Sequence, residues 1–173
     1  MRFTDEDSDS DKWIYCCVGG NTGGESLQMK YVHGEYLITL CGEHLLTHAY
    51  GPWNRECVSA FSRDYHLEVT PMIGKRWADI VVLIGESLLI PEAESLLVSR
   101  INAAAEFGLE AVALVIGRSS VKTSTRTQLE RMYEKTPLPV SFFSTYKEAA
   151  AWLESQGFSS STEQAEAHFS RIA

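Results

Sequence analysis

The residues with the clearest chemical potential lie in one loop, residues 117–127, whose sequence is GRSSVKTSTRT. The loop follows an apolar run typical of a buried strand and leads into a predicted helix. Open α/β sheets bind ligands at such strand ends, and guanidinium groups and helix N–H donors hold phosphate or carboxylate groups. We therefore predict a ligand site that includes Arg118, Ser119, Ser120, Lys122 and Arg126.

Two further polar residues, Glu86 and Ser87, end the other predicted central strand and are expected to reach the same region. The alternative is a solvated loop in which Ser and Thr side chains cap a helix. The loop has too few glycines for a phosphate-binding P-loop, and the pattern Gly-x-x-x-x-Gly-Lys is missing.

A second group with chemical potential comprises Cys41, His44 and His48. Thiolate and imidazole are zinc ligands, but His44 and His48 lie about 13 Å apart along an extended strand, too far for one tetrahedral ion. A nucleophile–base pair of Cys41 and His44 lacks a positioned carboxylate and an oxyanion-binding element. We therefore predict no metal site, no cofactor and no catalytic residue.

These two histidines and Cys41 belong to a predicted hairpin, in which Gly42-Glu43 separates two alternating runs within residues 36–50. A two-residue link that begins with Gly favours a type II′ turn. One face, which carries Ile38, Leu40 and Leu45, is expected to be the core side. The other face is mixed, and we expect a partner, a second copy or the N-terminal segment to contact it at Leu37, Leu46, His48 and Tyr50.

The rest of the chain predicts alternating helices and strands. Helices are expected over residues 52–65, 91–107, 125–135 and 145–156, and strands over residues 78–84, 111–116 and 139–143. Helices of this length between strands imply parallel pairing and right-handed crossovers. The order predicts a mixed sheet in which an antiparallel hairpin joins a parallel half. Ser161 and Gln164 match a capping box, which can start a short final helix.

Composition bounds the class of protein. The chain has 173 residues, 45% of them hydrophobic, and a net charge of −8, which argues against binding nucleic acid or an anionic membrane surface. Its longest apolar core run, residues 80–84, is too short to span a bilayer. The acidic first residues do not resemble a secretory signal. We expect a cytoplasmic protein with reduced thiols at Cys16, Cys17, Cys41 and Cys57.

Three segments follow from these patterns. Residues 1–26 are expected to form an acidic, partly flexible arm, residues 27–158 a single domain, and residues 159–173 a polar tail. Within the domain, residues 27–31 alternate in hydrophobicity and predict an edge strand, and His33-Gly34 predicts a turn.

Several short motifs occur along the chain in the same order as in one protein family. They are Gly51-Pro52-Trp53-Asn54, Trp77-Ala78, the run GLEAVA at residues 108–113, and Phe143 followed by AAAWL at residues 149–153. In these the chain resembles the SpoIIAA-like branch of the STAS superfamily. The resemblance implies a SpoIIAA-like mixed sheet with about four helices mainly on one face. Residues 88–94 lack the Asp-Ser-x-x-Gly segment that regulatory members phosphorylate, so that switch is not implied.

The functional expectation has two forms. The first is a non-enzymatic regulatory or interaction domain that binds a protein partner or forms a homodimer. The second is a small-molecule or anion-binding protein, for a phosphate, a nucleotide or a lipid, with its site at the carboxyl ends of the central strands.

Overall fold

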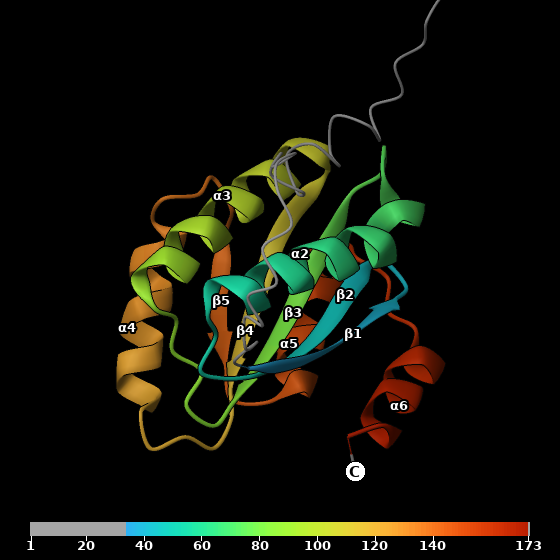
Figure 1. The fold of residues 1–173 in the computed structure, drawn as a ribbon. Coiled ribbons are helices and arrows are strands. Elements are labelled where there is room, and N and C mark those ends of the chain that lie inside the picture. Colours follow the sequence, from blue (N-terminus) through green and yellow to red (C-terminus); the bar gives the residue numbers. More distant parts are fainter. Residues whose placement is uncertain (1–33, 173) are drawn as a thin grey trace, which may run out of the picture.

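The structure is a computed structural model that describes residues 34–172. These residues form one five-stranded sheet in the order β1-β2-β3-β4-β5 (Figure 1). Strands β1 and β2 are antiparallel, and every other neighbouring pair is parallel. The predicted mixed sheet is therefore confirmed. The strands are Glu35–Cys41, His44–Tyr50, Trp77–Ile84, Leu109–Ile116 and Val140–Phe143.

Five α-helices and one short 3₁₀ helix, η1, accompany the sheet in the described part of the chain. They are α2 (Arg55–Val69), η1 (Thr70–Met72), α3 (Pro91–Phe107), α4 (Lys122–Tyr133), α5 (Tyr146–Ser155) and α6 (Thr162–Ser170). Helix α2 starts later than predicted because the Asn54 side chain caps it by accepting a hydrogen bond from the Cys57 backbone N–H, at 2.9 Å.

The helices cover both faces of the sheet, which differs from the expected arrangement on mainly one face. Helices α2, α3 and α4 pack on the side of Ile38 and Leu45, whereas α5 and α6 pack on the side of Leu46 (Figure 1). The reason lies in β3 and β4, which place large or small apolar side chains alternately on both faces, such as Ile80 and Leu83. An apolar strand of this kind needs a covering layer on each side.

The hairpin has the predicted register. Cys41 lies opposite His44, Leu40 opposite Leu45, and Ile38 opposite Thr47. Gly42 has a φ of 75°, the left-handed value that the first position of a type II′ turn requires.

The outer face of the hairpin, however, is not a free contact surface. Helix α6 packs against β1, and Leu46 and His48 are only 0% and 4% exposed. The interface predicted at Leu37, Leu46, His48 and Tyr50 therefore needs correction, because its two central residues are buried within this chain. Leu37 and Tyr50 remain partly exposed. The predictions for residues 1–26 and 27–31 lie outside the described residues.

The segment expected to be a polar tail provides that cover. The backbone N–H of Ser159 donates to the Glu43 carboxylate at 2.7 Å. Ser161 caps α6 by accepting from the Gln164 N–H, and the Gln164 side chain accepts from the Gly42 N–H at 3.0 Å. The predicted capping residues thus start a helix, but Gln164 holds the hairpin turn instead of closing the capping box.

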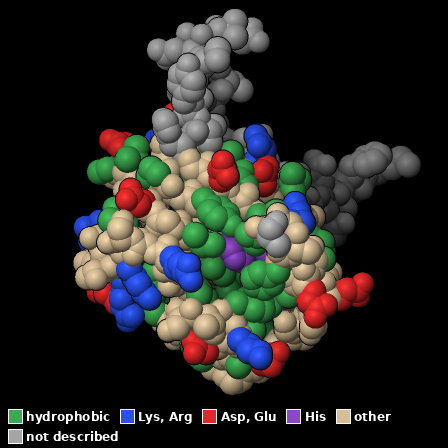
Figure 2. Space-filling view, turned by 90° about the horizontal axis from the view of Figure 1, so that it is seen from below, with side chains coloured by type: hydrophobic (Ala, Val, Ile, Leu, Met, Phe, Trp, Pro, Cys, Tyr) green, Lys and Arg blue, Asp and Glu red, His purple; other side chains and the backbone are tan. Residues whose placement is uncertain are grey.

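Two buried histidines fasten α6 to the hairpin. A hydrogen bond of 2.8 Å joins His48 Nδ1 to His168 Nε2, and another of 2.7 Å joins His168 Nδ1 to the Thr39 hydroxyl. Phe169 packs on His48 and on Tyr146, with ring centroids 5.4 and 5.0 Å apart. Figure 2 shows histidine surrounded by hydrophobic side chains on the face of the molecule that is seen from below. Burial lowers the pKa of both His48 and His168 to about 4.

This pair predicts acid sensitivity. Because both pKa values lie below the 6.5 of an unfolded histidine, the unfolded chain binds protons between pH 6.5 and 4 that the folded chain does not, and stability falls as the pH falls. The substitution His168→Asn should lower the free energy of unfolding by about 1–3 kcal/mol at pH 7.5. In urea unfolding, the free energy of unfolding of this variant should also decline less steeply between pH 6.5 and 4.5 than that of wild type. Ala167→Ser, on the exposed side of α6, is the control and should keep the wild-type decline. Parallel declines in His168→Asn and wild type would contradict the assignment.

Candidate functional site

A cavity of about 80 Å³ lies between the first face of the sheet and helices α2, α3 and α4. Strands β2 to β4 and the loops after β2 and β3 complete its wall. Ala49 and Ala104 contribute only a methyl group each to the lining, so space remains where larger side chains would meet. Most of the wall is apolar and includes Trp53, Phe61, Val81, Leu97, Ile101 and Leu114.

One wall of the cavity carries a buried carboxyl group. Asp79 lies on β3, on the same face as Val81 and Leu83, and is only 8% exposed. The Tyr65 hydroxyl lies 2.9 Å from both carboxyl oxygens, and it accepts a hydrogen bond from Trp77 Nε1 at 3.0 Å. Burial raises the pKa of Asp79 to about 7, although the hydrogen bond with Tyr65 acts in the opposite direction. Burial thus favours the protonated form of Asp79.

A second charged side chain, Arg100, also lines the cavity. Arg100 Nε is buried and has no hydrogen-bond partner among residues 34–172. Two of the hydroxyls that line the cavity are already used, since Ser62 donates to the Val58 carbonyl at 2.7 Å and Ser87 to the Ile84 carbonyl at 2.8 Å. Thr47 and Tyr133 also line the cavity. A bound molecule therefore meets a mostly apolar wall, in which Asp79 and Arg100 are the charged side chains.

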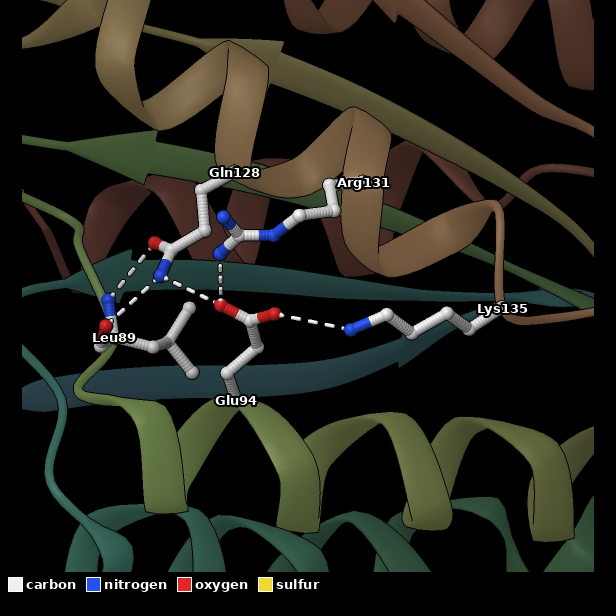
Figure 3. A network of polar contacts seen from close by, with 5 residues as sticks. All are labelled: Leu89, Glu94, Gln128, Arg131 and Lys135. Carbon is white, nitrogen blue, oxygen red and sulfur yellow. Dashed lines mark hydrogen bonds and ion pairs between the residues drawn. The ribbon is translucent and has the colours of Figure 1, made fainter.

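The loop that carries Leu89 into the cavity wall is held in place by the Gln128 side chain of α4 (Figure 3). The Gln128 amide donates to the Leu89 carbonyl at 2.8 Å and accepts from the Leu89 N–H at 3.0 Å. Gln128 also donates to Glu94, whose carboxylate receives Arg131 at 2.6 Å and Lys135 at 3.3 Å. The cavity wall is therefore connected to a polar network that reaches the surface.

The pKa of Glu94 reflects this network. Burial alone raises it, but the hydrogen bonds from Arg131, Gln128 and Lys135 outweigh burial and hold the pKa below its usual range. Glu94 therefore stays charged at neutral pH and keeps α3 and α4 together beside the cavity.

The predicted ligand residues are only partly brought together. Glu86 accepts from the Ser120 hydroxyl at 3.2 Å, and the Gly85 N–H donates to the Arg118 carbonyl at 3.0 Å, so the two loops are neighbours as expected. Of the predicted set, Ser87 lines the cavity. Ser119 accepts from the Val121 N–H at 3.1 Å, within its own loop.

One cation of that loop is engaged elsewhere. Arg126 pairs with Glu130 at 2.8 Å and lies over the Phe142 ring at 4.4 Å, while Arg118 and Lys122 are exposed. Binding of an anion by this loop stays a prediction.

The hairpin residues considered for metal or nucleophile chemistry are buried. Cys41 and His44 are almost inaccessible, and burial raises the pKa of the Cys41 thiol to about 11, which disfavours the thiolate. Among residues 34–172, no three His, Cys, Asp or Glu side chains are grouped as a metal ion would require. In the same part of the chain, no helix has the length and apolarity needed to cross a membrane.

Sequence reasoning missed Asp79 and the cavity beside it. The one available signal was a carboxylate within the apolar run at residues 78–84, a run typical of a strand buried on both faces.

Comparison with protein-family models, with curated proteins and with solved structures found no match for this chain. The SpoIIAA-like assignment therefore stays a prediction, and the α/β class with a mixed five-stranded sheet is what the structure supports.

Asp79 predicts a pH dependence opposite in sign to that of the histidines. Its raised pKa means that the folded chain holds a proton more tightly than the unfolded chain, whose Asp titrates near 4. The resulting stabilisation is complete below about pH 4 and is lost as the pH rises through about 7. In urea unfolding between pH 5 and 7, the free energy of unfolding of wild type should fall by about 1.4 kcal/mol per pH unit relative to that of Asp79→Asn.

Glu106→Gln provides the control, because it removes an exposed carboxyl from α3. Its pH profile should match that of wild type. If the Asp79→Asn profile also matched wild type, the buried carboxyl would have an ordinary pKa.

Proposed function

We propose that this protein binds a small, mostly apolar molecule in the cavity between its sheet and helices α2 and α3. The observation that carries the proposal is the Asp79 carboxyl, buried in the wall of an apolar cavity. Placing a carboxyl there is costly compared with an aliphatic side chain. Titratable groups with strongly shifted pKa values beside apolar cavities are typical of binding sites.

The cavity limits the size and chemistry of the ligand. A cavity of about 150 Å³ holds benzene, and this one is about 80 Å³, so it accommodates a few heavy atoms or one end of a longer chain. The ligand needs an apolar body and one polar end that can donate to Asp79 or accept from Arg100 Nε. A short aliphatic alcohol satisfies both requirements.

The interaction-domain hypothesis stays a prediction. The surface named for it loses Leu46 and His48, which α6 buries, so the cavity is the better supported site. Direct binding of alcohols separates the two functions, because an interaction domain has no need for an accessible interior.

The test is the affinity for straight-chain alcohols from ethanol to hexanol, measured by amide chemical shifts in NMR titrations. Each methylene that enters the cavity contributes about 0.8 kcal/mol, so the Kd should tighten about fourfold per carbon. The gain should stop once the chain is longer than the cavity. The shifts should centre on residues around Asp79 and Ala104.

Two matched variants of α3 make the test specific. Ala104→Leu fills the cavity and should weaken alcohol binding by about tenfold or more, because several methylenes of the alcohol can no longer enter it. Ala105→Leu makes the same change one residue along the helix, outside the lining, and should bind like wild type. Equal affinities in the two variants, or no dependence on chain length, would exclude the cavity as the site.

A further inference from the structure

One edge of the sheet has hydrogen-bonding groups that no strand of residues 34–172 satisfies, because β1 is the outermost strand and β2 is its neighbour on one side. Cys41 and His44 flank the two-residue turn, so they form a hydrogen-bonded pair. Antiparallel ladders alternate between bonded and non-bonded pairs. The backbone N–H and C=O groups of Tyr36, Ile38 and Leu40 therefore point away from β2, toward the open edge.

This edge lacks the features that normally prevent strand pairing. Natural edge strands carry Lys, Pro or a bulge, or are very short. Strand β1 has seven residues, EYLITLC, and pairs with β2 without a register shift. Its single charge is Glu35, at its start. The strand is thus a regular template along its whole length.

A groove of about 260 Å³ lies along the same edge. Tyr36, Leu37 and Ile38 of β1 line it, together with Arg171 after α6 and three residues of α2, namely Asp64, Leu67 and Glu68. Leu67 is 66% exposed, which is unusual for a large hydrophobic side chain in this structure. In Figure 1, β1 lies at the rim of the sheet with α2 and α6 on either side.

The charges beside the groove differ between its two sides, because Asp64 and Glu68 line it on the α2 side and Arg171 lines it after α6. On the α2 side, Asp64 accepts from the Tyr36 hydroxyl at 2.7 Å and pairs with Arg63, whereas Glu68 is exposed beside Leu67. An extended segment placed along β1 would direct every second side chain toward α2. There a Lys or Arg can cover Leu67 with its aliphatic stem and bring its charge to Glu68.

We propose that the open edge of β1 binds an extended peptide segment of a partner protein by strand addition, with basic side chains alternating with apolar ones. The main-chain groups of Tyr36, Ile38 and Leu40 supply the hydrogen bonds, as in other strand-addition complexes. Glu68 selects basic residues on the α2 side, while apolar residues on the opposite side contact Leu37.

A second copy of this chain is a less favourable occupant. A second copy paired through β1 would bring α2 next to its symmetry mate and place the Glu68 carboxylates near each other, in a chain of net charge −8. Residues 27–31 of this chain alternate in hydrophobicity, but they lie outside the described residues. Both occupants give distinct outcomes in the test below.

The test uses amide hydrogen exchange of the full chain, followed by NMR. Without peptide, the outward amides of Ile38 and Leu40 should exchange about tenfold or more faster than the ladder amides of Leu37 and Thr39. The peptide Ac-KVKVK-NH2 should slow the exchange of Ile38 and Leu40. The peptide Ac-EVEVE-NH2 should leave it unchanged, because its carboxylates meet Glu68.

A charge reversal provides the matched control. Glu68→Lys should invert the preference, so that Ac-EVEVE-NH2 protects the edge and Ac-KVKVK-NH2 does not. Glu134→Lys, an equal change at an exposed site after α4, should keep the wild-type preference. Three results would overturn the proposal. They are slow exchange of Ile38 and Leu40 in the monomer without peptide, protection that grows with protein concentration, and peptide selectivity that Glu68→Lys does not change.

Discussion

The arrangement of the molecule depends on one constraint, which is that β3 and β4 are apolar on both faces. Ile80 and Ala113 face one side, and Leu83 and Leu114 the other. Neither face can meet water without a large loss of hydrophobic free energy. Helices must therefore cover both, and because α5 lies over β3 and β4, the cover of the hairpin on that side falls to α6. The burial of His48 and His168 follows from this placement.

Much of the fold could be predicted from local signals. The alternation on both sides of Gly42-Glu43 was enough for the hairpin register, and the apolar runs were enough for the two central strands. Helix α6 was harder, because only Ala165 and His168 of its residues are buried. Two positions form no recognisable stripe, and the docking of α6 depends on Glu43 and Gly42, more than a hundred residues away in sequence.

The candidate site was less predictable for a different reason. The charged loop at residues 117–127 predicts a ligand site because charged side chains after a predicted strand form a local pattern in the sequence. The cavity lies instead between separate elements and has two alanines, Ala49 and Ala104, in its lining. No local pattern encodes the space between them. The sequence shows Asp79 within an apolar run, but it does not show the contacts of this carboxyl. Tyr65 and Trp77 come beside it only in the tertiary structure.

The bonds that hold α6 have a direction, which follows from the chemistry of imidazole. Each neutral ring has one donor and one acceptor nitrogen. If His168 donates to Thr39, it must accept from His48, and the far nitrogen of His48 is then bare. If Thr39 donates instead, both rings switch tautomer and that nitrogen carries the hydrogen. Rotation of the Thr39 hydroxyl on β1 thus decides whether the far nitrogen of His48 on β2 is a hydrogen-bond acceptor or a donor.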